Sequence, residues 1–456
     1  MILVMHYFIL LIALFGCTIT PLNAAPTRIE ITKGKVQPDP IAIISFTNGT
    51  DKKAAEKGEK IAEIIANDLR NCGLFMPIDK SVFIQTADEI QTKNINFPEW
   101  QKIGTRFIVT GTVILNSSST MTIEFRLFDI LDKKKMIAQS ITGDREKIRY
   151  LAHAVADQIY TRITTEAGYF NTHIVYSETH GPDKKRTSRL VFMDYDGHNA
   201  RNLTSTKNLV LTPRFSPTGK EIAYLKYEGR EAHVFVMNVT TKAEHKLGKI
   251  GEMNFAPRFS PDASAIIMSL IKDGSSAIYT MNLAARKLVR LTDHISIDTS
   301  PCYAPDGKQI TFTSDRSGQE KIYVMNANGS DVKRISFGDG QYSQPVWSPR
   351  SDLIAFTKRA VVDGQSRFFI GVMSPDGTNE RMIADGWLVE DPCWSSNGRY
   401  LIFTKQTSIN QKAELYMVDL TGYNLHKIET KGNASNGAWS PIASNIVNPI
   451  NTPAQQ

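Results

Sequence analysis

The chain has 456 residues, of which 41% are hydrophobic and 22% are charged, and its formal net charge is +7. This length allows two domains, and this composition is typical of a soluble globular protein and excludes extended disorder. The basic clusters at residues 133–135 and 184–186 lie in turn-like stretches without interleaved aromatic residues. They favour solvated loops, so we expect no nucleic-acid partner.

The first 24 residues contain no Lys, Arg, Asp or Glu and carry an apolar core from Tyr7 to Phe15. This core is too short to span a bilayer, and the small residues Ala24 and Ala25 follow it. We therefore predict a cleaved secretory signal over residues 1–24 and no direct membrane insertion of the mature chain. The alternative, a lipoprotein cleavage box ending at Cys17, fits poorly because of the bulky Phe15.

Beyond the signal the cysteines are Cys72, Cys302 and Cys393, an odd number for a secreted protein. Cys302 and Cys393 occupy corresponding positions in two copies of a repeat that are not neighbours. We expect buried free thiols and no disulfide framework.

Residues 25–168 are predicted to form a small α/β domain. The polar and apolar alternation of residues 28–32 indicates a half-buried or edge strand, and the apolar run at residues 41–46 indicates a central strand. Residues 107–114 and 122–128 are expected to be two further strands joined as a hairpin.

Two helices complete this predicted domain. The apolar residues of segment 53–71 fall on one helical face, and Gly73 stands where a left-handed cap belongs. Segment 145–165 places apolar residues at i, i+3, i+4 and i+7, and we expect Gly168 to end it. The boundary with the second domain, residues 169–456, is predicted at this point.

A repeat organises the second domain. Its first Pro stands at Pro213, Pro257, Pro301, Pro345 and Pro392, with Gly437 in the sixth place, in steps of 44, 44, 44, 47 and 45 residues. Each copy predicts an aromatic-bearing strand entered through Pro, a Pro-Asp-Gly type turn and three more short strands. Four strands in a repeat of this length are typical of a propeller blade.

The last repeat is incomplete at its C-terminal end, and the missing strands are found ahead of the first repeat at residues 174–177, 190–194 and 201–204. We therefore predict an α/β N-terminal domain followed by an all-β six-bladed propeller of four-stranded blades. The last blade is expected to be closed by both chain ends, which leaves no free sheet edge.

The repeat motif is interpreted as scaffold. Its aromatic side chains are expected to be buried between blades, and its Pro and Gly residues are turn chemistry. The six aromatic positions are Phe215, Phe259, Tyr303, Trp347, Trp394 and Trp439.

No catalytic motif accompanies the scaffold. Propeller peptidases need a nucleophile elbow, and no Gly-x-Ser-x-Gly occurs in the sequence. His-Glu-x-x-His, a Walker loop and a dinucleotide fingerprint are also absent, and the nine His residues show no metal-ligand spacing. We predict a protein that is not an enzyme and that has no cofactor, no catalytic residues and no metal site.

Function is expected in the segments that differ between copies, which are the loops leading into each innermost strand. They include residues 208–212, 251–255, 296–300, 341–344 and 387–391. Polar groups and a few exposed apolar ones around a channel mouth would form a protein-binding surface.

The chain resembles the TolB family of periplasmic proteins of the Tol-Pal system over essentially its whole length. The signal peptide, the stretch Asp68-Leu69-Arg70-Asn71-Cys72-Gly73-Leu74-Phe75 followed by Pro77-Ile78-Asp79, and the six-fold repeat ending in Trp439-Ser440-Pro441 carry this resemblance together.

The resemblance implies a periplasmic adaptor, monomeric outside its complex, that binds the lipoprotein Pal at the propeller mouth and TolA through the mature N-terminus. It also implies roles in outer-membrane integrity and in envelope invagination at cell division. The implied Pal contacts are Met253, Asn254, Ser296, Asp298, Thr299, Tyr342 and Ser343. The implied TolA contacts are Arg28, Ile29, Glu30, Ile31 and Thr32.

Two other hypotheses remain open at this point. A secreted propeller hydrolase or sugar-processing enzyme would require inward-facing catalytic carboxylates or a bound metal, and the Asp residues inside the repeat are typical of turns. A solitary scaffold without a Pal partner is the third hypothesis.

Overall fold

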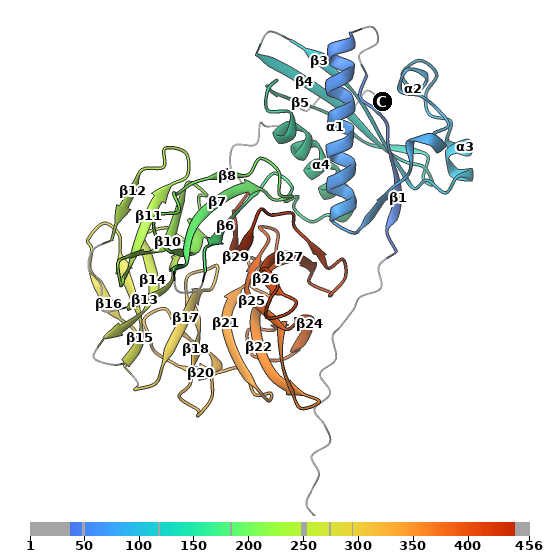
Figure 1. The fold of residues 1–456 in the computed structure, drawn as a ribbon. Helices are drawn as coiled ribbons and strands as arrows, with labels where there is room; N and C mark the ends of the chain where they lie inside the picture. Colours follow the sequence, from blue (N-terminus) through green and yellow to red (C-terminus); the bar gives the residue numbers. More distant parts are fainter. Residues whose placement is uncertain are drawn as a thin grey trace, which may run out of the picture.

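The computed structural model describes residues 37–47, 51–116, 119–182, 185–247, 253–272, 275–293 and 295–442. The predicted signal peptide and the predicted strand at residues 28–32 lie outside these residues. Within them the chain forms a smaller N-terminal domain and a larger propeller, which meet along one side (Figure 1).

The N-terminal domain contains a five-stranded sheet in the described residues. Its strand order is β2 (Phe75–Pro77), β1 (Asp39–Ile43), β3 (Phe107–Leu115), β4 (Thr120–Asp129) and β5 (Lys134–Asp144). Strand β1 runs parallel to β2 and β3, whereas β3, β4 and β5 form an antiparallel meander. Side chains of β4 alternate between buried and partly exposed, as a strand with one side packed against the core requires.

Helices cover both faces of this sheet (Figure 1). Helix α1 (Lys52–Asn71) and helix α4 (Ile148–Thr164) pack against one face with a common apolar core. The shorter helices α2 (Ala87–Lys93) and α3 (Phe97–Lys102) supply Ile90 and Trp100 to a second core on the other face. A 3₁₀ turn at Lys80–Val82 follows β2.

The structure corrects three details of the predicted domain. Helix α4 ends at Thr164 because Thr165 adopts the left-handed conformation, with φ of 64°, so Gly168 does not terminate it. Strand β5 begins at Lys134, inside the basic stretch interpreted as a turn. Helices α2 and α3 were not expected, since each is too short to show clear periodicity. Gly73, with φ of 75°, does follow α1 as predicted.

The propeller contains six four-stranded sheets in the described residues, as predicted. Blade 1 is β9 (Val210–Phe215), β10 (Glu221–Glu228), β11 (Glu231–Asn238) and β12 (Glu244–Lys246); blade 2 is β13 (Met253–Phe259), β14 (Ala265–Lys272), β15 (Ser275–Asn282) and β16 (Leu288–Arg290); blade 3 is β17 (Asp298–Tyr303), β18 (Gln309–Ser314), β19 (Lys321–Asn326) and β20 (Lys333–Arg334). Blade 4 is β21 (Gln341–Trp347), β22 (Ile354–Val362), β23 (Gln365–Met373) and β24 (Arg381–Gly386); blade 5 is β25 (Leu388–Trp394), β26 (Tyr400–Gln406), β27 (Glu414–Asp419) and β28 (His426–Lys427); blade 6 is β29 (Asn433–Trp439), β6 (His173–His180), β7 (Thr187–Asp194) and β8 (Arg201–Asn202).

Blade 6 joins strands that are distant in the sequence. Strand β29 pairs antiparallel with β6, with Trp439 opposite Ile174. The indole Nε1 of Trp439 also donates a 2.7 Å hydrogen bond to Thr172 Oγ1. The inner strand of this sheet therefore comes from the C-terminal part of the described chain, and its other strands come from the start of the propeller.

Each inner strand contains a bulge that the sequence did not reveal. The residue before the repeat's Pro position has φ between 49° and 56° in all six blades, and the pairing register shifts there. The six residues are Thr212, Ala256, Ser300, Gln344, Asp391 and Asn436. A left-handed non-glycine residue is strained, so this conformation is imposed by the propeller and not by local preference.

Candidate functional site

The two ends of the propeller carry different segments. We call the distal end the one that carries the loops entering the inner strands and the hairpins between second and third strands. The proximal end carries the turns that follow the inner strands. The N-terminal domain contacts the proximal end, where Asn397 Nδ2 donates to the carbonyl of Ala167 at 2.9 Å and Tyr400 donates to the carbonyl of Cys72 at 2.9 Å.

The distal end exposes large hydrophobic side chains on three neighbouring blades. They lie in loops entering β17, β21 and β25 and in the hairpins β22–β23 and β26–β27. We call this set the distal patch: Ile295, Ile297, Phe337, Val361, Trp387 and Ile409, with exposed fractions of 92%, 56%, 69%, 67%, 45% and 71%. Exposed apolar side chains gathered at one end of a soluble protein mark a surface for contact with another protein.

A buried ion pair stabilises the first loop of the distal patch, which carries Ile295 and Ile297. Asp298 is fully buried, and both its carboxylate oxygens accept hydrogen bonds from Arg316 Nη2, at 3.1 and 3.0 Å. Ser296 Oγ donates to the same carboxylate at 3.0 Å. Because Ser296 and Asp298 turn inward, Ile295 and Ile297 face solvent.

A second buried network supports the loop that carries Phe337. Tyr342 donates its hydroxyl to Glu380 Oε1 at 2.8 Å and accepts a 2.6 Å hydrogen bond from Lys358 Nζ. Lys321 Nζ lies 4.9 Å from the centre of the Tyr342 ring and donates to the carbonyls of Gly338 and Gly340. Burial, with the adjacent Glu380 carboxylate, raises the pKa of Tyr342 well above its ordinary value. The loop beside Phe337 is therefore fixed by charged groups beneath it.

These networks correct part of the sequence interpretation. Ser296, Asp298 and Tyr342 were expected to meet a partner directly, but their side chains are buried and hold the loops. Thr299 and Ser343 are partly exposed beside them. Met253 and Asn254 begin β13, opposite Ile271 and Leu270.

The sequence interpretation emphasised polar loop residues and missed most of the distal patch. Ile297 and Trp387 lie within the predicted loops 296–300 and 387–391, whereas Ile295, Phe337, Val361 and Ile409 lie outside every segment predicted to bind a partner. The sequence does contain a signal for these residues. Apolar residues within turn-rich stretches are not part of a core, so they are expected to be exposed. Arg28 to Thr32 lie outside the described residues.

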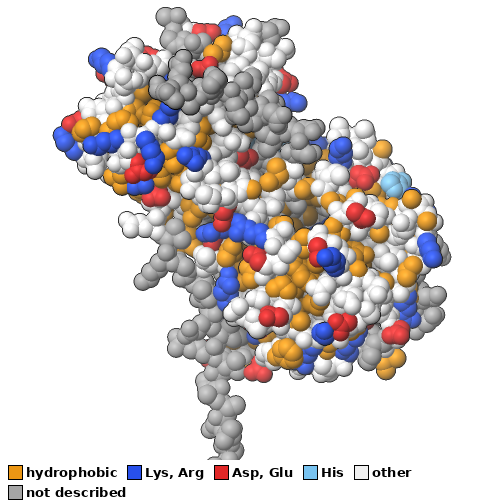
Figure 2. Space-filling model, turned by 180° about the vertical axis from the view of Figure 1, so that it is seen from behind, with side chains coloured by type: hydrophobic (Ala, Val, Ile, Leu, Met, Phe, Trp, Pro, Cys, Tyr) orange, Lys and Arg blue, Asp and Glu red, His pale blue; other side chains and the backbone are white. Residues whose placement is uncertain are grey.

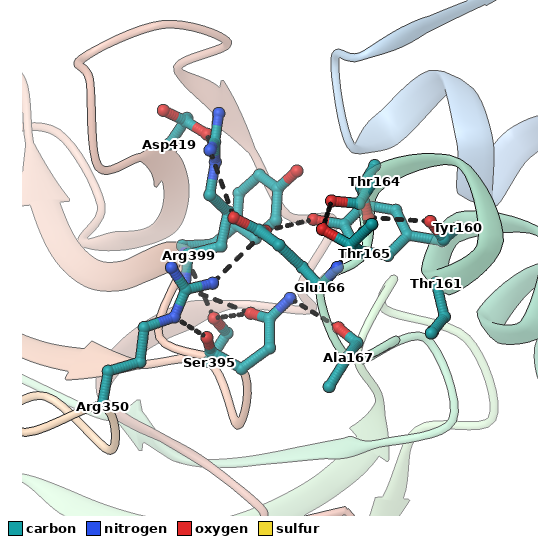
Figure 3. Close-up of polar contacts among 12 residues, drawn as sticks. Tyr160, Thr161, Thr164, Thr165, Glu166, Ala167, Arg350, Ser395, Arg399 and Asp419 are labelled. Atoms are coloured by element: carbon teal, nitrogen blue, oxygen red, sulfur yellow. Dashed lines mark hydrogen bonds and ion pairs between the residues drawn. The ribbon is translucent and has the colours of Figure 1, made fainter.

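The junction between the domains is built around the connecting segment 165–172. Figure 3 shows Glu166 of this segment between Arg350 and Arg399 of the propeller, at 3.3 and 3.5 Å. Tyr160 of α4 donates a 2.9 Å hydrogen bond to the same carboxylate, and Arg399 Nε also pairs with Asp419 at 2.5 Å. The segment is thus attached to both domains by side-chain contacts.

The stretch beginning at Asp68 is the other half of this junction. Asn424 donates to the carbonyl of Asn71 at 2.6 Å, and a Cβ on Gly73 would lie 2.7 Å from the Asn424 side chain. Asp68 is fully buried and accepts hydrogen bonds from Tyr195 of the propeller at 2.8 Å and from His153 of α4 at 2.7 Å. The end of α1 therefore docks on the propeller through backbone carbonyls and one carboxylate.

Three side chains at this junction, two aspartates and a histidine, are of the types that bind metal ions. The ligand atoms of Asp68, His153 and Asp196 lie within 4.8 Å of one another. Each is already engaged, because Asp68 pairs with His153 and Tyr195, while Arg149 Nη2 pairs with Asp196 at 2.5 Å. Burial raises the pKa of Asp68. Burial acts to lower the pKa of His153, but Asp68 and Asp196 together raise it above its ordinary value. The group is a hydrogen-bonded cluster of charged side chains, in which side chains such as Arg149 supply the positive charge.

The propeller surface carries charges of both signs. Figure 2 shows Lys and Arg side chains interspersed with Asp and Glu, and hydrophobic side chains among them, on the face turned to the viewer. Among the described residues no helix combines the length and the apolar character needed to cross a membrane. Cys72, Cys302 and Cys393 are buried free thiols, as predicted, and burial raises the pKa of Cys72 to about 12.

This fold and this surface define a class of binding protein: a six-bladed propeller with an apolar distal end and an α/β domain docked on its proximal end. The sequence matches the TolB amino-terminal domain over residues 27–136 and the TolB beta propeller domain over residues 160–443. The chain belongs to the TolB family of Tol-Pal system proteins, as the resemblance indicated.

Relatives named Tol-Pal system protein TolB align along nearly the whole chain. The protein of Pelagibacter ubique is 50% identical over 441 residues, which cover 94% of this chain and 98% of the relative. The protein of Paramagnetospirillum magneticum is 51% identical over 423 residues, which cover 92% and 93%. The crystal structure of TolB from Acinetobacter baumannii superposes with a TM-score of 0.79 at 25% identity, covering 90% of this chain and 99% of that one. The predicted α/β domain and six-bladed propeller of four-stranded blades are confirmed, and the family is non-enzymatic, so the alternative of a propeller hydrolase is not favoured.

Proposed function

We propose that this chain is the periplasmic adaptor of the Tol-Pal system and binds the lipoprotein Pal through the distal end of its propeller. Membership of the TolB family supports a partner within this system. The observation that carries the proposal is the distal patch, whose six large hydrophobic side chains are exposed on neighbouring blades.

The buried networks favour the distal patch as a preformed docking surface. Loops fixed before binding lose less conformational entropy when a partner docks, so more of the contact energy remains as affinity. The Asp298 and Arg316 pair fixes the loop of Ile297, and Lys321 fixes the loop of Phe337. In this proposal Ser296, Asp298 and Tyr342 act by positioning these loops.

The remaining predicted Pal contacts fit around the distal patch. Thr299 and Ser343 are partly exposed next to the buried pairs and offer hydroxyl groups to a partner. Met253 and Asn254 begin an inner strand at the same end. A central apolar contact with a polar border is the usual arrangement of a protein interface.

We further propose that residues 28–32 bind TolA by adding a strand to its sheet. The alternation of Arg28 to Thr32 would place Ile29 and Ile31 on one side, with backbone hydrogen bonds supplying affinity. Joining an outer-membrane lipoprotein to an inner-membrane protein accounts for the proposed roles in outer-membrane integrity and in envelope invagination at division. The chain is proposed to act as a monomer outside this complex.

The test of the Pal site is calorimetric titration of the mature chain with the soluble domain of Pal from the same organism. Ile297→Asp and Trp387→Ala remove exposed apolar contacts, and each should weaken binding by about ten-fold or more if it is a central contact. Val289→Asp is the matched control, because Val289 is 42% exposed on the outer strand β16, away from the distal patch. Unchanged affinity of both patch variants would remove the distal patch from the Pal site.

A further inference from the structure

The proximal end of the propeller channel contains a cavity unrelated to the distal patch. It has a volume of about 440 Å³ and is lined by the ends of the six inner strands and the turns that follow them. Pockets of this size commonly hold small organic ligands.

Two arginines at equivalent repeat positions face this cavity. Arg214 and Arg258 each follow the repeat's Pro, in blades 1 and 2, and both line the cavity. Arg214 is only 7% exposed, and its Nη1 donates to the carbonyl of Pro213 at 2.7 Å. The Nε atoms of both arginines are buried and have no hydrogen-bond partner within the part of the chain that the structure describes. Buried N–H groups without partners are costly, so they point to a missing acceptor.

The cavity contains two further polar groups of this kind. Trp347 and Ser396 line the cavity, and the indole Nε1 of Trp347 and the hydroxyl of Ser396 are buried and lack partners among the described residues. Two other indoles of the cavity do have acceptors, since Trp394 donates to the carbonyl of Val346 at 3.0 Å and Trp439 donates to Thr172. Four residues that line the cavity therefore each carry a donor without a partner among the described residues, and the group that would satisfy such donors is an acceptor.

The charge balance of the cavity favours an anion. Neither guanidinium forms an ion pair within the described chain. Burial and the charge of Arg258 lower the pKa of Arg214 to about 10, while Asp391 acts in the opposite direction. The oxygens of Asp391 already accept hydrogen bonds from Gln344 at 2.9 Å and Asn436 at 2.5 Å. Arg214 and Arg258 are therefore both influenced by a single carboxylate, that of Asp391, whose oxygens already accept hydrogen bonds from other residues.

The walls of the cavity are apolar. Phe259, Trp347, Trp394 and Trp439 line it together with prolines of the turns. Such walls favour a ligand that carries an apolar body next to its charged group over a small, fully hydrated ion. A guanidinium matches a planar carboxylate through parallel N–H groups.

We propose that this cavity binds a small organic carboxylate, with its charged group between Arg214 and Arg258 and its apolar body against the tryptophans. This site lies at the opposite end of the channel from the distal patch, and the proposal does not rest on Pal or TolA binding. The same donors could take up inorganic phosphate, and the experiment separates the two ligands.

The experiment titrates the mature chain with benzoate, with its neutral analogue benzamide and with inorganic phosphate, followed by calorimetry and tryptophan fluorescence. We expect benzoate to bind, to change the emission of the cavity tryptophans and to bind more weakly as salt rises. Benzamide and phosphate should each bind about ten-fold more weakly or not at all, because one lacks the charge and the other lacks the apolar body.

Arg214→Gln and Arg258→Gln test the assignment of the charged group. Each should weaken benzoate binding by about ten-fold, since a charge-assisted hydrogen bond is lost. Arg367→Gln is the control, because Arg367 is 51% exposed on β23. Circular dichroism checks that the variants fold. If they do not fold, the comparison of the three ligands on the unmodified chain still decides. Equal binding of benzoate and benzamide, tighter binding of phosphate, no benzoate binding at about 10 mM, or unchanged binding by folded variants would each overturn the proposal.

Discussion

The carboxylate of Asp68 accepts a 2.8 Å hydrogen bond from the hydroxyl of Tyr195, and this contact joins helix α1 to the propeller. His153 binds the other oxygen of the same carboxylate at 2.7 Å, so a fully buried acid is satisfied by one group from each domain. The Asp68 stretch, which is part of the resemblance to the TolB family, is therefore one of the two docking elements between the domains.

Replacing Tyr195 with Phe should lower the free energy of unfolding by about 1.5–3 kcal/mol, because a buried carboxylate loses a hydrogen-bond donor. Urea denaturation followed by circular dichroism measures this change. Tyr227→Phe is a suitable control, since Tyr227 is partly exposed and its hydroxyl has no hydrogen bond among the described residues. Equal stability of the two variants would show that the Asp68 contact does not hold the domains together.

Asp157 predicts a pH dependence of stability. Burial raises its pKa to about 7, although its carboxylate accepts hydrogen bonds from the backbone N–H groups of Phe170 and Asn171. Because the pKa in the folded state exceeds that of an unfolded aspartate, about 3.9, the stabilising contribution is complete below about pH 4 and is lost as the pH rises through about 7.

The change is measured as the difference in unfolding free energy between the wild type and Asp157→Asn, from about pH 5 to about pH 8. The wild type should lose about 2 to 3 kcal/mol relative to the variant over this range. Parallel pH profiles for the two proteins would mean that Asp157 is ionised in the folded state at every pH tested.

The structure changes what is expected of Asp298. As an exposed contact, its replacement would weaken Pal binding and leave the melting temperature unchanged. Its carboxylate instead pairs with Arg316 in a buried site. Asp298→Asn should therefore lower both the melting temperature and the affinity for Pal, because the loop of Ile297 loses its support and Arg316 loses its countercharge.

Differential scanning calorimetry and titration with Pal on the same sample measure both effects. Thr299→Ala serves as the comparison, because Thr299 is partly exposed and should affect affinity alone. A loss of affinity in Asp298→Asn with no change in melting temperature would restore the direct-contact interpretation.

The repeat was predictable from the sequence because its spacing, its turn residues and its aromatic positions are local signals that recur in every copy. The helices α1 and α4 were predictable from periodicity, although the end of α4 was not. Thr165 takes the left-handed conformation there, and nothing in a threonine signals it. The bulges in the inner strands could not be predicted for the same reason, since residues such as Gln344 and Ala256 do not favour φ above zero.

The candidate site was less predictable because burial in a loop depends on distant residues. Ser296, Ile297 and Asp298 are neighbours in one loop, yet only Ile297 faces solvent. This orientation is set by Arg316, which lies 18 residues beyond Asp298 and contributes the buried ion pair. The sequence predicts that the loop of Ile297 lies at the propeller mouth, but a sequence alone does not decide which of its side chains point outward.

Strand addition by the mature N-terminus gives a separate prediction for TolA. Placing Pro at Ile29 and Ile31 removes two backbone donors that a paired strand needs, so binding to the soluble domain of TolA should be abolished. Affinity for Pal should survive, because the distal patch is untouched. Ile29→Ala with Ile31→Ala is the control that keeps the backbone donors. Unchanged TolA affinity of the double-Pro variant would exclude strand addition by this segment.

Strand β29 supplies the inner strand of blade 6, and Trp439 is its main anchor. Its indole is 5% exposed, stacks near Tyr195 with ring centres 6.4 Å apart and donates to Thr172, so it connects the last strand to the start of the propeller. Trp439→Ala should lower the free energy of unfolding by about 3–5 kcal/mol, because it leaves a cavity and removes the hydrogen bond to Thr172.

Truncation after Gly432 removes β29 altogether and uncovers the edge of β6, to which β29 is hydrogen-bonded. An uncovered edge strand is a template for pairing with other chains, so the truncated protein should aggregate. Size-exclusion chromatography and a melting curve compare it with a control truncated after Ile442, which retains β29. Because β29 still covers the edge of β6 in the control, the control should stay monomeric. A truncation after Gly432 that is also monomeric and melts like the control would show that the propeller does not depend on this strand.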